Sequence, residues 1–405
     1  MQGQKPGRHL AIALGLALLL SLALAAPGRC QELLLPNLQA SANRIFDQTS
    51  PEGRLKCTIE RENPSLDFTF HFDAGFRISC PVYQFGGQMT RVWILARVTP
   101  EGGSPVLLGM STIFRRSALE PSLLRRTGTS VLFRVSGGFS VGEGRYRVEV
   151  ALADSHDRIC RRSWRIKVPH HWQKAVPVVL AAHQVSPLSI PPWRGPQSKD
   201  GLRLAILLSA DSYNPGAPRL GAGYQMMLLQ ILSTLLQEVP CKSVRLVAFN
   251  LDQEQVIYTV DSFEPSGFDV LQRAINGLNL GVVSVQTLQK RNEWANMLTT
   301  LANQQLTAQP PPDAVIILGR SFRYMKKLPR EMLMFRYERM PGFFYFENGP
   351  DNLFPDSLGF LIKSLKGKIY RVSTPHDLST AIEKMLAQVR ETGRSGQANL
   401  YNLGK

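Results

Sequence analysis

The sequence predicts a multidomain protein in which an all-β sandwich is followed by a doubly wound, Rossmann-like α/β domain. Residues 50–168 contain short segments rich in Val, Ile, Phe and Tyr that are separated by turn residues, a pattern typical of an antiparallel sandwich. Residues 201–390 instead alternate apolar strand-like runs with helix-like segments. Between them, residues 169–200 hold six prolines and are expected to form a semi-rigid linker.

The first thirty residues have the pattern of a secretory signal peptide. Lys5 and Arg8 precede an apolar run at 10–26, which small residues and Pro27 then end. Cleavage after Ala25 and cleavage after Cys30 both fit. An uncleaved anchor is the alternative, but the run is short for a membrane span. We therefore expect an exported protein, periplasmic or extracellular, without an integral membrane span after cleavage.

The chain is basic, with 47 Lys and Arg against 31 Asp and Glu and a formal net charge of +16. The basic residues are scattered and form no single tract. Such a charge attracts anionic surfaces through long-range fields, so the expected partner is a protein or an anionic envelope polymer. Basic and aromatic residues do not interleave as in single-strand binders, and we expect no nucleic-acid partner.

Four cysteines remain after a cleavage that follows Cys30, namely Cys57, Cys80, Cys160 and Cys241, and they allow three disulfide connectivities. We predict a bridge between Cys57 and Cys80 because both lie in neighbouring strand-like segments. Free buried cysteines are the alternative, since the domain is large enough to fold without covalent links. No CxxC or Cys/His spacing indicates zinc.

The first half supplies seven or eight strand-like segments. They are 55–59, 66–72, 76–79, 92–98, 106–114, 131–135, 146–153 and 163–168. The last two, with the turn around Asp154, resemble in pattern the closing hairpin of immunoglobulin-like or fibronectin-like modules. This half shows no constellation of residues that requires a chemical explanation.

The second half is organised around residues 201–214. Residues 204–208 are apolar throughout, as in a strand buried on both faces of a sheet, and polar residues follow them. A helix to about Val239 and a strand at 243–250 complete a βαβ unit. Ligand sites in such sheets form at the carboxyl ends of the strands, so the loop that begins at Ser209 is the first candidate site.

Further elements continue the alternation. We expect strands at 256–260, 314–318, 343–346 and 368–372 and helices at 268–278, 288–306 and 358–365, with a final helix that starts near Thr374. The strand at 256–260 is expected to pair antiparallel with its predecessor at one sheet edge. Residues 391–405 are polar and are expected to be disordered.

This order of elements, together with the closing segment IYRVSTPHDLSTAI at 369–382, resembles the von Willebrand factor A-like domain over residues 201–389. Metal-binding members of that family use an Asp-x-Ser-x-Ser loop, a Thr and a further Asp, which are oxygen ligands suited to a hard cation. Counted from Asp211, the serine positions hold Tyr213 and Pro215, and Arg320 follows the fourth strand. The resemblance therefore implies a degenerate metal site. No cofactor is expected, and Mg²⁺ is the less favoured possibility.

From these residues we hypothesise that Arg320 lies beside Asp211 and that its guanidinium replaces the cation. The resulting expectation is a non-catalytic interaction or adhesion module that binds its partner through loop residues. The candidates are Ser209, Asp211, Ser212, Tyr213, Asn214, Thr287, Arg320 and Arg323. The basic and aromatic segment 322–346 either extends this surface or simply covers the sheet.

Catalytic motifs are missing from the sequence, which has no Gly-x-Ser-x-Gly elbow, His-Glu-x-x-His pair, Walker loop or Gly-x-Gly-x-x-Gly fingerprint. The alternative from another class is an envelope hydrolase centred on Ser209 or Asp211, with a base such as His376. A metal-dependent adhesive domain with an unorthodox site at the same residues is the third possibility.

Overall fold

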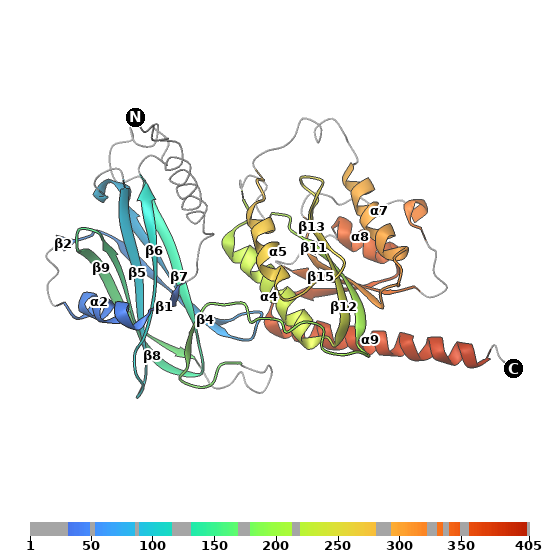
Figure 1. Cartoon of the computed structure of the whole chain (residues 1–405), viewed down its shortest axis with the longest axis horizontal. Helices are drawn as coiled ribbons and strands as arrows, with labels where there is room; N and C mark the ends of the chain where they lie inside the picture. Colours follow the sequence, from blue (N-terminus) through green and yellow to red (C-terminus); the bar gives the residue numbers. More distant parts are fainter. Residues whose placement is uncertain are drawn as a thin grey trace, which may run out of the picture.

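The computed structural model describes residues 31–48, 53–85, 89–115, 131–168, 179–212, 219–280, 293–321, 330–334, 340–348 and 356–402. They form a β-rich domain and an α/β domain, drawn side by side in Figure 1. The predicted signal peptide lies outside these residues. No helix in the described part of the chain is long and apolar enough to cross a bilayer.

The first domain consists of two facing sheets. The first sheet has the strand order β1 (Glu32–Leu33), β6 (Val106–Arg115), β5 (Met89–Pro100), β8 (Gly144–Asp154), β9 (Arg158–Val168) and β2 (Gly53–Arg54). The second sheet has the strand order β10 (Val185–Pro187), β7 (Leu132–Val141), β4 (Phe72–Pro81) and β3 (Thr58–Leu66). Strand β4 buries every second side chain, from Phe72 to Cys80. Both sheets contribute side chains to one apolar core, which agrees with the predicted sandwich.

Two local expectations for this domain are wrong. The segment 66–72 is not a strand, because residues 67–71 form the turn between β3 and β4, where the amide of Asp67 donates to the carbonyl of His71. The domain also begins earlier than residue 50. Helix α2 (Pro36–Asp47) lies on the outer face of the first sheet, where Ala42 and Phe46 pack against its apolar side chains.

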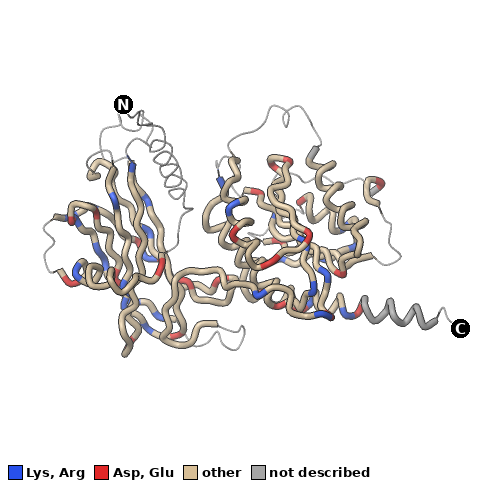
Figure 2. Tube along the Cα trace, in the orientation of Figure 1, with Lys and Arg blue, Asp and Glu red and all other residues tan. Residues whose placement is uncertain are grey.

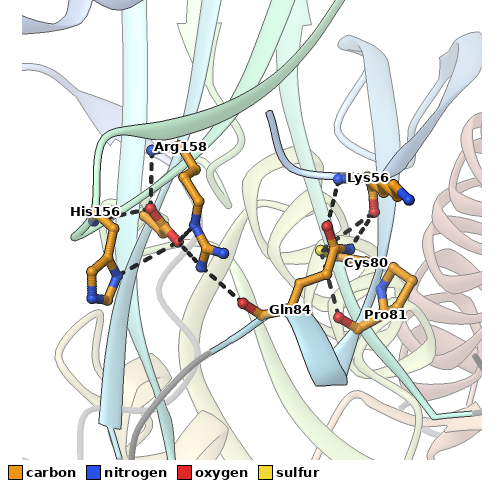
Figure 3. A network of polar contacts seen from close by, with 7 residues as sticks. Lys56, Cys80, Pro81, Gln84, His156 and Arg158 are labelled. Carbon is orange, nitrogen blue, oxygen red and sulfur yellow. Dashed lines mark hydrogen bonds and ion pairs between the residues drawn. The ribbon is translucent and has the colours of Figure 1, made fainter. Parts of the chain in front are cut away.

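The predicted Cys57–Cys80 disulfide is also wrong. Cys57 instead bonds to Cys160 on β9, and this bridge joins the two sheets. Cys80 is a buried free thiol whose Sγ lies 3.7 Å from the Lys56 carbonyl and 3.5 Å from Nε2 of Gln84 (Figure 3). Burial raises the pKa of Cys80 to about 11. Cys57 therefore does not bond to its neighbour Cys80 on the second sheet, because its partner Cys160 lies on the facing sheet.

The proline-rich segment is part of both domains, so the prediction of a simple linker is wrong for its described residues. Residues 185–187 form β10, which pairs antiparallel with β7. Trp193 is 1% exposed and stacks on Phe263 of the α/β domain with ring centroids 5.9 Å apart. The buried ring therefore anchors the end of this segment in the core of the second domain.

The second domain is built on one six-stranded sheet. Its order is β13 (Gln255–Val260), β12 (Cys241–Asn250), β11 (Leu202–Ser209), β14 (Ala314–Gly319), β15 (Gly342–Asn348) and β16 (Lys368–Val372). All neighbouring pairs are parallel except β12 and β13. The expected antiparallel edge strand is thus confirmed, and the central strand β11 is buried from Leu204 onward.

Helices cover both faces of this sheet, as expected for a doubly wound domain. Helices α4 (Ala222–Glu238), α5 (Gly267–Asn276) and α9 (Pro375–Asn402) share one core with the sheet, whereas α7 (Glu293–Leu306) and α8 (Ser357–Ser364) pack on the opposite face. Side chains of β11 alternate between the two cores, because successive strand residues point to opposite faces. Helix α9 continues to Asn402, so the expectation of a disordered tail is wrong for residues 391–402.

The turn between β3 and β4 connects the two domains, and in Figure 1 it reaches across to α4. Nε2 of Gln230 donates to Oδ2 of Asp67 over 2.6 Å, and Oγ1 of Thr234 donates to the Phe68 carbonyl over 2.7 Å. The Phe68 side chain packs against the α/β core. Polar and apolar contacts thus fix this turn on one helix of the second domain.

Candidate functional site

The candidate site lies where the chain leaves the central strands β11 and β14. Strand β11 has neighbours β12 and β14, and the chain order reverses between β11 and β14. A doubly wound sheet has its natural crevice at this point, outside the carboxyl ends of the strands. Ser209 ends β11 and Gly319 ends β14, so the residues that follow them are brought together.

Ser209 and Gly319 hold the two strand ends together. Oγ of Ser209 donates to the carbonyl of Arg320 over 3.0 Å, and Ser209 is fully buried. Gly319 has φ of +110°, and a Cβ at this position would collide with the carbonyl oxygen of Ser209. Glycine is needed here both for the backbone conformation and for the close approach. The hydroxyl of Ser209 therefore joins strand ends within the protein interior.

Asp211 is completely buried and has an unusual ionisation. One carboxylate oxygen, Oδ1, accepts a hydrogen bond of 2.7 Å from the amide of Leu251. Burial, and secondly the charge of Asp252, raise the pKa of Asp211 to about 8, although the hydrogen bond from the Leu251 amide acts in the opposite direction. At neutral pH the carboxyl group is thus largely protonated, which makes it a poor ligand for a divalent cation.

The turn after β12 is fastened to the same site. Nδ2 of Asn250 donates to the carbonyl of Ala210 over 2.7 Å, and Oδ1 of Asn250 accepts from the amide of Gln253 over 2.7 Å. The Leu251 amide reaches Asp211 in the same turn. Asn250 and Asp211 therefore work as a pair that connects the ends of β11 and β12.

The hypothesis that Arg320 forms an ion pair with Asp211 is wrong for the described residues. Arg320 is fully buried, but its Nη2 lies 3.8 Å from Oε1 of Glu347, at the end of β15. The causes of the shift in the pKa of Asp211 include no positive charge. The sequence correctly placed Arg320 at the carboxyl edge of the sheet. Its acidic neighbour, however, lies on β15 and not in the segment that follows β11, and β14 separates these two strands.

Asp356 is a residue of this region that we did not select from the sequence. Its Oδ1 accepts from the amide of Gly359, which caps α8. Its Oδ2 accepts from the amide of Ser321 over 2.9 Å and from the hydroxyl of Tyr345 over 2.6 Å. Burial raises the pKa of Tyr345 well above its ordinary value. An aspartate directly before the apolar start of a helix is an N-cap signal, which could have identified Asp356.

The remaining selected residues divide into two groups. Ser212 follows Asp211 and is buried. Tyr213, Asn214, Thr287 and Arg323 lie outside the described residues, as does most of the segment 322–346.

The described geometry offers little to a hydrolase. His376 begins α9 after β16, and β14 and β15 separate β16 from β11 in the sheet. The hydroxyl of Ser209 donates instead to the carbonyl of Arg320. No group of three or more His, Cys, Asp or Glu side chains within the described ranges is placed to hold a metal ion.

Comparisons with known proteins do not identify the chain. No protein-family model and no curated protein matches it. Among solved structures, a lipoprotein from Bacteroides thetaiotaomicron aligns at 10% identity with a TM-score of 0.17, over 34% of this chain and 98% of that chain. A conjugate transposon protein from Bacteroides vulgatus aligns at 9% identity with a TM-score of 0.16, over 31% and 94%.

A longer alignment is found with a β-glucuronidase from Bacteroides uniformis. It has 10% identity and a TM-score of 0.17, and it spans 76% of this chain but 38% of that enzyme. TM-scores this low establish neither a shared fold nor a shared function.

Proposed function

We propose that this protein is a non-catalytic interaction module of the cell envelope, exported by its signal peptide, with a divergent von Willebrand factor A-like domain as the binding unit. In this proposal a protein partner binds the loops at the carboxyl edge of the α/β sheet without a metal ion. The strand order, with one antiparallel edge strand, agrees with the resemblance in sequence. The periplasmic or extracellular location follows from the signal-peptide pattern alone.

One observation carries the proposal. The polar side chains where β11 and β14 end are buried and bind the protein's own backbone, as Ser209 does with the carbonyl of Arg320 and Asp211 with the amide of Leu251. A nucleophile or metal ligand must instead face a substrate or ion. These residues therefore act as supports that fix the loops above them, which is what a preorganised binding surface requires.

The test places a photo-crosslinking amino acid at exposed Arg219, which lies just before α4 at the carboxyl edge, and in a matched protein at exposed Lys368, at the amino end of β16. Each protein is exported in its native host and irradiated in intact cells. We expect one defined protein adduct from position 219 and none from position 368. Equal adduct patterns from both positions would contradict a partner site at the carboxyl edge.

A second measurement distinguishes the metal-dependent alternative. Thermal unfolding is followed in EDTA and then in millimolar magnesium, manganese or calcium, because an ion that binds only the folded state raises the midpoint. The proposal predicts an unchanged midpoint. A clear rise that Asp211→Asn abolishes would replace it with a metal-dependent adhesive domain.

A further inference from the structure

We propose that the β-sandwich carries a second site, a groove that binds a linear, phosphate-bearing polyanion through Arg145, Arg147, Arg165 and Lys167. The groove is separate from the carboxyl edge of the α/β sheet, and the proposal goes beyond the partner-binding function assigned there. Figure 2 shows Lys and Arg spread along the strands of the sandwich.

The groove follows from the register of three strands. Arg147 lies opposite Arg165, and Arg145 lies opposite Lys167, so β8 and β9 present two cation pairs on the same outer face. Strand β5 adds Thr99, which lies opposite Arg147. These residues, together with the acidic Glu101, line a hollow of about 440 Å³ on the surface. Helix α2 packs at the other end of this face, near Ala151 and Ala153, and leaves the four cations exposed.

Nearby acidic residues neutralise the four cations only in part. Within the described residues, neither Arg165 nor Lys167 has an acidic oxygen within 4.0 Å. Arg145 is 4.0 Å from Glu101, with both side chains 66% exposed, and water screens such a pair strongly. Glu149 contacts Arg147 at 3.2 Å, but it also binds Arg97 at the shorter distance of 2.8 Å.

Protection of a sheet edge does not account for this arrangement. Strand β9 pairs with β2 only at Arg158 and Ile159, so basic residues on the rest of β9 would discourage pairing with another chain. That reason does not apply to Arg145 and Arg147, because β8 is paired on both sides, with β5 and β9. Like charges directly opposite one another destabilise a sheet, so the two pairs reduce stability unless an anion binds them.

The spacing of the cations selects the class of ligand. Opposite side chains in a sheet are about 5 Å apart, and alternate residues of one strand are about 7 Å apart. A single phosphate can contact one or two of these cations, whereas a chain with a charge every few ångströms contacts all four. Arg presents a planar fork of donors that matches the oxygens of a phosphate, and three of the four cations are Arg.

The experiment measures binding of the folded, mature protein to linear polyphosphate of defined length by calorimetry, with orthophosphate at the same total phosphate as the comparison. We expect saturable binding of polyphosphate, binding of orthophosphate at least about tenfold weaker, and loss of affinity with added salt. The double variant Arg165→Glu, Lys167→Glu should bind polyphosphate at least about tenfold more weakly. Both side chains are exposed, and the substitutions replace like-charged cross-strand pairs with oppositely charged ones, so the thermal midpoint should not fall below that of the wild type.

The double variant Arg61→Glu, Arg134→Glu is the matched control, because it changes the net charge by the same amount at exposed arginines on β3 and β7 of the other sheet. It should bind polyphosphate like the wild type. An equal loss in both variants would show that net charge matters rather than the groove, and would overturn the proposal. Equal affinities for orthophosphate and polyphosphate would overturn the assignment of a polymer. Binding to phosphatidylglycerol vesicles without binding to polyphosphate would overturn it in favour of a lipid surface.

Discussion

The two domains place their polar groups in opposite ways. In the α/β domain, Ser209, Asp211 and Arg320 are fully buried at the carboxyl edge of the sheet. In the sandwich, Arg165 and Lys167 are exposed on the outer face of the first sheet, without an acidic neighbour among the described residues. Buried polar groups must find partners within the protein, and exposed charges remain available to ligands. The first arrangement supports loops, whereas the second is suited to bind an anion directly.

The domains also differ in what stabilises their sheets. The two sheets of the sandwich are joined by the Cys57–Cys160 bridge, whereas the single sheet of the α/β domain is held between helices on both faces. Variants that affect one domain and leave the other unchanged therefore test the comparison.

The largest effect is expected from Cys160→Ser. The bridge closes a loop with a sequence separation of 103 residues, for which the chain-entropy relation gives a loss of about 5 kcal/mol in the sandwich. Urea unfolding of the oxidised proteins measures it, and Cys80→Ala serves as the control for loss of a buried cysteine. If Cys80→Ala also released a free thiol from Cys57, the pairing would be Cys57–Cys80 after all.

Asp211→Asn should change the pH dependence of the α/β domain. The pKa of Asp211 is about 8 in the folded protein against 3.8 ordinarily, so the unfolded chain releases its proton first as pH rises. Its contribution is therefore complete below about pH 4 and is lost as pH rises through 8. We expect the variant to gain roughly 4 kcal/mol relative to the wild type between pH 5 and pH 9, because this window covers about three of the roughly four units by which the pKa is shifted.

Urea titrations at the two pH values measure this difference. Asp200→Asn is the control, since Asp200 is exposed in the segment before β11. A stability difference between Asp211→Asn and the wild type that did not vary with pH would show that Asp211 ionises normally.

Gly319→Ala tests how closely β11 and β14 approach each other. The new Cβ would meet the carbonyl of Ser209 at a φ of +110°, so we expect a loss of about 3 kcal/mol. Gly102→Ala in the sandwich is a matched control, because Gly102 has φ of +75° but no atom within 4 Å of the added Cβ. Its loss should be about 1 kcal/mol. Equal losses would mean that backbone conformation alone explains the cost.

The smallest effect is expected from Thr234→Val, which removes the donor to the carbonyl of Phe68 between the domains. The loss should be about 1 kcal/mol, and it should separate the unfolding transitions of the two domains in calorimetry. Thr299→Val removes a hydrogen bond to the Ala295 carbonyl within α7 and should not separate them. If both variants separated the two unfolding transitions, the coupling between the domains would depend on the stability of the α/β domain and not on the contact between Thr234 and Phe68.

The sequence predicted the layers of this protein because they depend on local periodicity. The apolar run at 204–208 became the buried part of β11, and the strand at 256–260 became the antiparallel edge strand β13. Each of these predictions depends on a few adjacent residues, whose spacing determines the faces they present.

The partners of individual side chains could not be predicted in the same way. Cys57 lies 103 residues from Cys160, and Arg320 approaches Glu347 from a different strand. Trp193 seemed to belong to a linker, but it fills space in a core made by residues far along the chain. Such contacts depend on how complete layers pack, and no local pattern records that.

The turn between β3 and β4 has a mechanical consequence. Helix α4 begins at Ala222, directly after the loop that leaves the candidate site, and its residues Gln230 and Thr234 hold the turn of the sandwich. A partner that displaced the start of α4 would pull on Asp67 and Phe68 at the same time. The start of α4 and this turn of the sandwich would then move together.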